Sequence, residues 1–217
     1  NSKTSKSKQP AIEQPNSATK AIIETRVSSS SSSIHPSNMN SSTIVVKEAS
    51  QELEDIRCVP AYSGVAFPAA CRSLLYSLPG NSNCVDCGNP GPDWASISFG
   101  CLLCLQCSGR HRSYGVKTSF VRSISMDVWS HSQVLAMLEG GNAQLTSFFE
   151  RHQMTSCNTQ RYLTKAARFY RTNLVKHVEE VARNGVYQGR EAARQKHSSD
   201  KKKAIKHAKS MTPMKRP

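Results

Sequence analysis

The sequence predicts an α+β fold that is mainly helical, in which a small four-cysteine metal-binding module with a short sheet is surrounded by helices. Two CxxC pairs stand close together between Cys84 and Cys107, a spacing typical of metal ligands. Apolar residues recur at helical spacing on both sides of this segment. Only 37% of the 217 residues are hydrophobic and 6% aromatic, so we expect part of the chain to be disordered.

Composition divides the chain into three predicted parts. Residues 1–60 are rich in serine, including the run from Ser28 to Ser33, and are expected to be disordered because they cannot bury enough apolar surface. Residues 66–184 carry the expected zinc domain. Residues 185–217 hold ten Lys or Arg and two acidic residues, much of the net charge of +14, and are expected to be a basic, largely disordered tail.

Apolar periodicity and helix-ending residues predict the elements of the central part. A first helix begins at Pro68, where proline suits the first turn, and ends before Pro79 and Gly80. Asp127 is expected to cap a later helix. The other expected elements are a short helical piece within 51–66, a strand within 119–124, a helix carrying Val134, Leu135 and Leu138 that ends at Gly140, a helix from Ala143 to about His152, and an amphipathic helix over 159–183, interrupted near 171–174.

The cysteine spacing allows two ligand sets. Cys84 and Cys87 pair either with Cys101 and Cys104, leaving 13 residues between the pairs, or with Cys104 and Cys107, leaving 16. A glycine soon after the second cysteine of a CxxC helps the tight turn that such a site needs. Glycine follows Cys87 directly and Cys107 after one serine. The second set is therefore favoured, and Cys101 is then a small buried apolar residue.

Four thiolates are typical of a structural site for a single Zn²⁺ with no open coordination position. In small zinc peptides such a site contributes about 10–16 kcal/mol of apparent binding energy, which becomes folding energy. A zinc-finger module of this spacing also occurs in DNA-binding fingers of the GATA type, and the basic tail suits nucleic acid or an anionic membrane. Charge and cysteine spacing alone leave these alternatives open.

The residues around the cysteines are more specific. The sequence resembles the Arf GTPase-activating protein (ArfGAP) domain over about residues 68–180. The motifs that carry the resemblance are PDWAS at 92–96, FG at 99–100, CSGRHRSYG at 107–115, SFVRS at 119–123, MDVW at 126–129, GGN at 140–142, RY at 161–162 and AARFYR at 166–171. Tyr114, Lys117, Met126 and Thr146 depart from the usual family pattern.

The resemblance implies a function and roles for individual residues. It implies that this ArfGAP-like chain is a GTPase activator and not itself an enzyme, and that it stimulates GTP hydrolysis by a GTP-bound Arf-family GTPase in vesicle traffic. Arg112 would be the catalytic arginine finger, supplied in trans. Trp94, Arg110 and Lys117 would contact the partner. The implied zinc ligands are those of the 16-residue set: Cys84, Cys87, Cys104 and Cys107.

Localisation and alternative functions follow as further expectations. No run of 18 apolar residues and no secretory signal are present, so we expect a cytoplasmic protein. It would sit peripherally on Golgi, endosomal or plasma membranes, with the basic tail on the anionic lipid surface. No nucleic-acid partner is expected. The alternatives are a GATA-like nucleic-acid-binding protein and a non-catalytic scaffold with the ArfGAP fold.

Overall fold

A three-stranded antiparallel sheet in the order β2-β1-β3 supports the cysteine segment. In the computed structural model of the chain, the strands are β1 (Trp94–Ser96), β2 (Cys101–Leu103) and β3 (Val121–Ser123). Ala95 lies opposite Leu102 on one side and Arg122 on the other. The structure describes residues 37–60, 63–154, 159–195 and 199, all within one compact unit.

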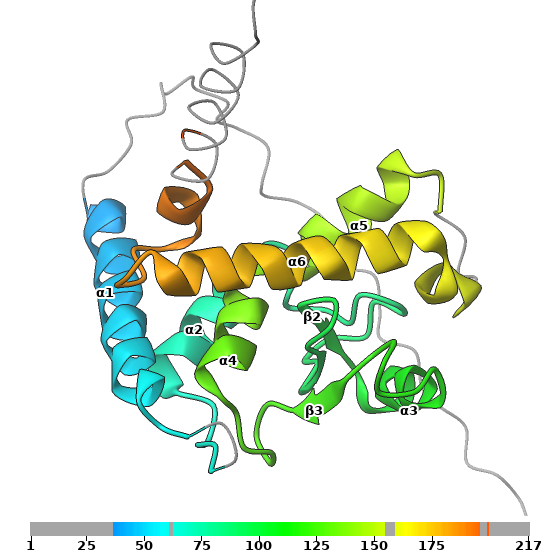
Figure 1. Cartoon of the computed structure of the whole chain (residues 1–217), viewed down its shortest axis with the longest axis horizontal. Helices are drawn as coiled ribbons and strands as arrows, with labels where there is room; N and C mark the ends of the chain where they lie inside the picture. Colours follow the sequence, from blue (N-terminus) through cyan, green and yellow to red (C-terminus); the bar gives the residue numbers. More distant parts are fainter. Residues whose placement is uncertain (1–36, 61–62, 155–158, 196–198, 200–217) are drawn as a thin grey trace, which may run out of the picture. The chain divides into compact units, whose positions relative to one another are not determined.

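Helices surround this sheet, as the sequence predicted (Figure 1). They are α1 (Ser37–Arg57), α2 (Ala69–Ser77), α3 (Leu105–Ser113), α4 (His131–Glu139), α5 (Asn142–Arg151), the 3₁₀ helix η1 (Thr159–Leu163) and α6 (Lys165–Arg183). Residues 190–195 are also helical. Among the described residues, no helix is long and apolar enough to cross a bilayer.

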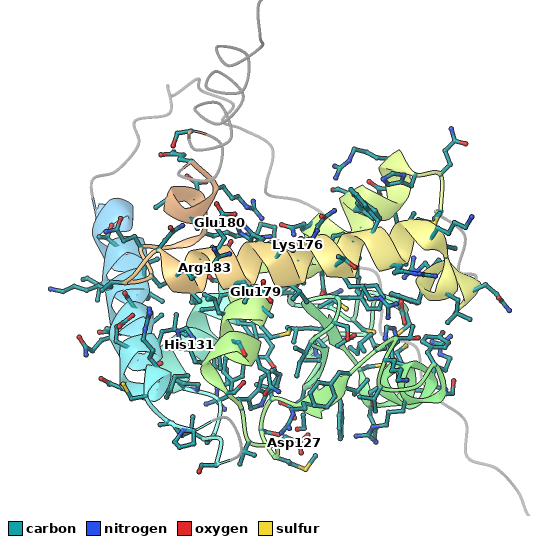
Figure 2. The ribbon with its side chains drawn as sticks, viewed as in Figure 1. Asp127, His131, Lys176, Glu179, Glu180 and Arg183 are labelled. Carbon is teal, nitrogen blue, oxygen red and sulfur yellow. The ribbon has the colours of Figure 1, made fainter. Side chains whose placement is uncertain are left out.

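Helix α6 covers the core with one apolar face. Its buried residues recur every three or four positions, whereas Lys176, Glu179 and Arg183 lie on its exposed face (Figure 2). The predicted break near 171–174 is wrong, because buried Tyr170 and Leu174 are one turn apart and keep the helix continuous. The break lies before Lys165 instead, where the Thr164 hydroxyl accepts a hydrogen bond from Ala167 N at 3.1 Å.

Helix α1 corrects the prediction that residues 1–60 are disordered. Residues 1–36 lie outside the described residues, but 37–57 form a helix whose Ala49, Leu53 and Ile56 are buried. These three residues lie at helical spacing and pack α1 against α2. Glu52 also accepts hydrogen bonds from Ala70 N (3.0 Å) and Cys71 N (2.9 Å), so its carboxylate caps the first turn of α2.

The folded part also extends beyond the predicted boundary at residue 184. Tyr187 is only 4% exposed, and its carbonyl accepts a hydrogen bond from the Ser50 hydroxyl of α1. Arg57 of α1 donates to the carbonyls of Ala182 (3.1 Å) and Gly185 (2.8 Å). Residues 185–195 therefore close the core together with α1, and the tail prediction can hold only for residues beyond them.

The loop before α4 differs from the prediction in one capping residue. Ser130 is the N-cap of α4 and forms a capping box with Gln133, whose side chain accepts from Ser130 N at 3.1 Å. Asp127 accepts from Ser123 N at 2.7 Å instead. Asp127 therefore ties the loop back to β3 and does not cap the helix.

Candidate metal centre and arginine site

The structure brings the four predicted ligand cysteines together at one end of the sheet. The sulfur atoms of Cys84, Cys87, Cys104 and Cys107 all lie within 4.8 Å of one another, and the Cys87 and Cys104 Sγ atoms are 3.5 Å apart. A tetrahedral site with Zn–S bonds of about 2.3 Å places its sulfurs about 3.8 Å apart. Four thiolates at this separation therefore fit a structural zinc ion. Cys101, in β2, is fully buried in the main core and outside this cluster.

Local turns give the cluster its shape. Gly88 has φ +74°, the left-handed region that glycine enters without strain, and its N–H donates to Cys84 O at 2.9 Å. On the other side, Cys104 is the N-cap of α3, and its sulfur accepts from Cys107 N at 3.5 Å. Helix α3 therefore begins at the four-cysteine cluster, so the cysteines fix where this helix starts.

Arg112 lies in the last turn of α3. Its guanidinium carbon is 4.4 Å from the centroid of the Trp94 ring, a distance typical of a cation–π contact. Trp94 in β1 is half-buried and packs against Cys84, Leu103 and Cys107. Arg112 is exposed, and its guanidinium forms no hydrogen bond or ion pair with the side chains and backbone of the described residues. Because no hydrogen bond uses the guanidinium N–H groups, they can bind an anion.

A buried polar network holds α3 against the first CxxC turn. His111 is fully buried, with Nε2 at 3.1 Å from Asp86 Oδ2 and Nδ1 at 2.8 Å from Ser119 Oγ. Tyr162 Oη (2.5 Å) and Arg161 Nη2 (2.6 Å) both donate to Asp86 Oδ1. Burial alone would raise the pKa of Asp86, but the hydrogen bonds from His111, Tyr162 and Arg161 hold this pKa well below its usual range.

Sequence reasoning missed this network. Each member of the network stood within a motif that the sequence analysis had noted or beside a motif residue. Asp86 is inside the CVDC motif, His111 precedes Arg112, and the RY pair is at 161–162. Spacing alone could not show that residues 25 and 75 positions apart share one carboxylate. The network surrounds the residue next to Arg112, and it therefore helps to fix the direction in which α3 presents Arg112.

The other two predicted partner residues have contacts within the chain. Arg110 Nη2 donates to Cys107 Sγ at 2.8 Å, a charge-assisted hydrogen bond if the sulfur is a thiolate. Lys117 is exposed, and its main-chain carbonyl accepts from Arg171 Nη1 of α6 at 2.6 Å. Arg171 also donates to Thr118 O at 2.8 Å. The loop after α3 is thus tied to α6, while the Lys117 side chain faces solvent.

Comparison with known proteins gives a family for this site. A family model described as "Putative GTPase activating protein for Arf" matches residues 70–179. ADP-ribosylation factor GTPase-activating protein 3 of Macaca fascicularis is 46% identical over 102 residues, covering 46% of this chain and 20% of that protein. The rat protein of the same name is 47% identical over 102 residues, covering 46% of this chain and 19% of that protein.

A yeast relative agrees with these matches. ADP-ribosylation factor GTPase-activating protein GCS1 of Saccharomyces cerevisiae is 46% identical over 80 residues, covering 37% of this chain and 23% of that protein. The chain therefore spans about a fifth of the length of the curated relatives it matches. The matched region includes the sheet, the four-cysteine cluster and Arg112. On the family match and the cysteine cluster, the chain belongs to the ArfGap family.

Proposed function

We propose that this chain is a GTPase-activating protein for a GTP-bound Arf-family GTPase, and that it supplies Arg112 to the active site of that partner. The relatives named as ADP-ribosylation factor GTPase-activating proteins support the partner class. An arginine supplied in trans stabilises charge that develops on the transferred phosphoryl group, and this contribution is worth about 10³–10⁵ in rate.

The placement of Arg112 is the observation that carries this proposal. It follows the two cysteines that begin α3, in the last turn of the same helix, and its guanidinium carbon lies over the Trp94 ring, 4.4 Å from the centroid. The buried His111 beside it anchors the helix to Asp86. An arginine finger needs a free fork of N–H donors on a rigid support. Arg112 has such a support, and its guanidinium forms no hydrogen bond with the described residues.

The metal in this proposal is one structural Zn²⁺ held by Cys84, Cys87, Cys104 and Cys107. It would supply no catalytic chemistry, since four thiolates complete its coordination. The Arg110 hydrogen bond to Cys107 Sγ offsets part of the negative charge of four thiolates. Arg110 thus has a role at the proposed metal site and, since it is exposed, also remains a proposed partner contact. Trp94 and Lys117, the first beneath Arg112 and the second exposed on the following loop, remain proposed partner contacts.

Membrane association and localisation are also proposals. An Arf-family partner acts in vesicle traffic, so the chain would work in the cytoplasm, peripherally on Golgi, endosomal or plasma membranes. The basic residues of the tail would add attraction to anionic lipid of about 1 kcal/mol for each Lys or Arg near the surface. Deleting residues 200–217 would then weaken binding to anionic vesicles, and unchanged binding would contradict this role.

The test is GTP hydrolysis by an Arf-family GTPase measured in a single turnover with the zinc-loaded chain. We expect strong acceleration that collapses in Arg112→Lys, because an ammonium lacks the planar fork of the guanidinium. Arg72→Lys, at an exposed position of α2 outside the site, is the matched control and should keep most of the activity. Acceleration that survives in Arg112→Lys would contradict the assignment of the finger. No acceleration across the Arf family would indicate the scaffold alternative.

A further inference from the structure

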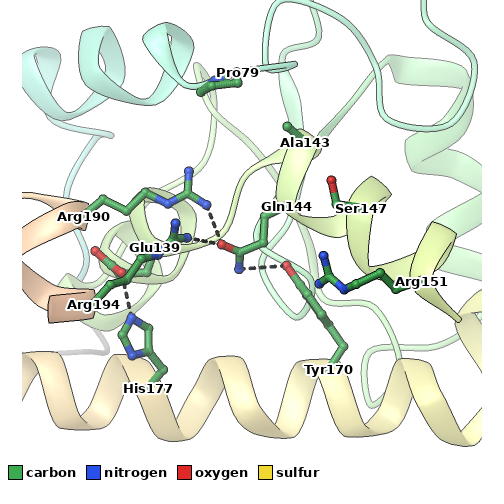
Figure 3. Close-up of a pocket in the computed structure, with 10 residues that line it drawn as sticks. All are labelled: Pro79, Glu139, Ala143, Gln144, Ser147, Arg151, Tyr170, His177, Arg190 and Arg194. Atoms are coloured by element: carbon green, nitrogen blue, oxygen red, sulfur yellow. Dashed lines mark hydrogen bonds and ion pairs between the residues drawn. The ribbon is translucent and has the colours of Figure 1, made fainter. Parts of the chain in front are cut away.

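A second charged site lies apart from the cysteine cluster, in a hollow of about 640 Å³ between α5, α6 and residues 190–194. Three segments each turn polar residues toward it (Figure 3). Gln144, Ser147 and Arg151 lie on one face of α5, at i, i+3 and i+7. Tyr170 and His177 come from α6, and Arg190 and Arg194 come from the C-terminal segment. Within each of these two pairs the residues are also at helical spacing. A volume of this size is typical of small-ligand sites.

Positive charge in this hollow exceeds negative charge. Arg151, Arg190 and Arg194 line it, and Glu139 is the one carboxylate among the lining residues. Glu139 is fully buried, and its Oε2 is 2.7 Å from His177 Nε2. One of its two carboxylate oxygens is therefore engaged by an imidazole. The Arg151 guanidinium forms no hydrogen bond or ion pair with any residue that the structure describes.

Two of these guanidinium groups converge on one neutral oxygen. Arg190 Nη2 donates to Gln144 Oε1 at 2.6 Å, and Arg194 Nη2 donates to the same oxygen. Like charges one helical turn apart repel each other. Burial lowers the pKa of Arg190, and the nearby charge of Arg194 lowers this pKa further. An amide oxygen offsets little of this repulsion, whereas an anion between the two groups would.

We propose that this hollow binds a multiply phosphorylated anion of the inositol phosphate class, either free or as the headgroup of a phosphoinositide lipid. Arginine binds phosphate through two parallel N–H donors, and three arginines that line one hollow suit more than one phosphate group. Figure 3 shows Arg190 and Arg194 on one side of Gln144 and Arg151 on the other, so separate phosphates could contact the two sides. The Ser147 hydroxyl adds a neutral donor or acceptor. This site does not depend on the proposed GTPase activation.

The test is calorimetric titration of the full zinc-loaded chain with inositol trisphosphate. The variant Arg151→Gln/Arg194→Gln removes two exposed arginines of the hollow. The control Arg72→Gln/Arg168→Gln removes the same charge from exposed positions that do not line it. We expect one binding site and a loss of about a hundredfold in affinity in the first variant, because each charge-assisted hydrogen bond contributes about tenfold. The control should bind like the wild type.

Vesicles distinguish the two sources of the anion. Phosphatidylcholine vesicles carrying phosphatidylinositol bisphosphate are compared with vesicles of equal charge carrying phosphatidylserine. If the first bind more tightly and only the Arg151→Gln/Arg194→Gln variant loses the difference, the ligand is the lipid headgroup. If only binding of the free trisphosphate is weakened by Arg151→Gln/Arg194→Gln, the ligand is the soluble inositol phosphate. If the trisphosphate does not bind, or if both double variants weaken binding equally, the proposal is overturned.

Discussion

Asp86 offers the sharpest test of how the metal module is joined to the rest of the domain. Replacing it with alanine removes the shared acceptor of His111, Tyr162 and Arg161. The Asp86 and Arg161 side chains are only 12% and 15% exposed, so solvent screens their attraction little. Breaking a buried ion pair on one side typically costs 3–5 kcal/mol, and we expect Asp86→Ala to lower the free energy of unfolding by about this amount.

The variant Asp86→Asn should fall between wild type and Asp86→Ala. Its amide oxygen can still accept from Tyr162 or Arg161, but the negative charge that faces Arg161 is lost. Asp55→Ala is the matched control, because Asp55 is exposed and its carboxylate accepts a hydrogen bond from the neighbouring Gln51 side chain at 3.0 Å. A surface change of this kind alters stability by about 0.5 kcal/mol or less.

The assay is denaturant unfolding of each protein at one buffered concentration of free zinc, since metal binding adds to folding energy. Zinc content is measured in parallel, so that loss of metal is not mistaken for loss of the network. Asp86→Ala within about 0.5 kcal/mol of the wild type, with full zinc, would refute the reasoning.

Three other predictions concern parts of the fold that can be tested independently. Tyr187→Ala should lower the free energy of unfolding by about 3–5 kcal/mol because it removes a buried aromatic ring. The neighbouring Val186→Ala, at a 60% exposed site, should change this free energy little. Equal effects of the two changes in denaturant unfolding would contradict the docking of residues 185–195. Removing the metal with a strong chelator should change the tryptophan fluorescence, because Trp94 packs against the cysteine cluster. It should also lower helicity by circular dichroism, because α3 begins at that cluster. Unchanged spectra would argue against a structural metal. Brief alkylation at neutral pH should modify exposed Cys58 well before Cys71. The reason is that burial and then the charge of Glu52 raise the pKa of the Cys71 thiol to about 12. Equal modification of the two cysteines, measured by mass spectrometry, would contradict the burial of Cys71.

Local patterns accounted for much of the fold. The helices α2, α4 and α5 lie where apolar spacing and the glycines at 140 and 141 placed them. The four cysteines of the favoured ligand set are clustered. These features depend on neighbours in the sequence or on a fixed spacing. A single sequence, without an alignment, is therefore enough to predict them.

Features that depend on distant contacts were not predicted. Helix α1 has a weakly apolar sequence and packs through three residues, Ala49, Leu53 and Ile56, against elements further along the chain. Tyr187 stands in a basic segment, and its burial depends on α1. The Asp86 network joins residues from four separate segments. Composition describes each segment alone, and therefore it cannot show which segments cover one another.

The most direct test of the central proposal separates binding from rate for Arg112. Affinity for the GTP-bound Arf-family partner and single-turnover hydrolysis at saturating chain are measured for the zinc-loaded wild type and Arg112→Lys. A group that acts in the transition state lowers the rate when it is removed, with little change in ground-state affinity. We predict similar affinities and a rate lower by about 10³-fold or more. A variant that binds less tightly but hydrolyses at the wild-type rate when saturated would contradict the arginine-finger role.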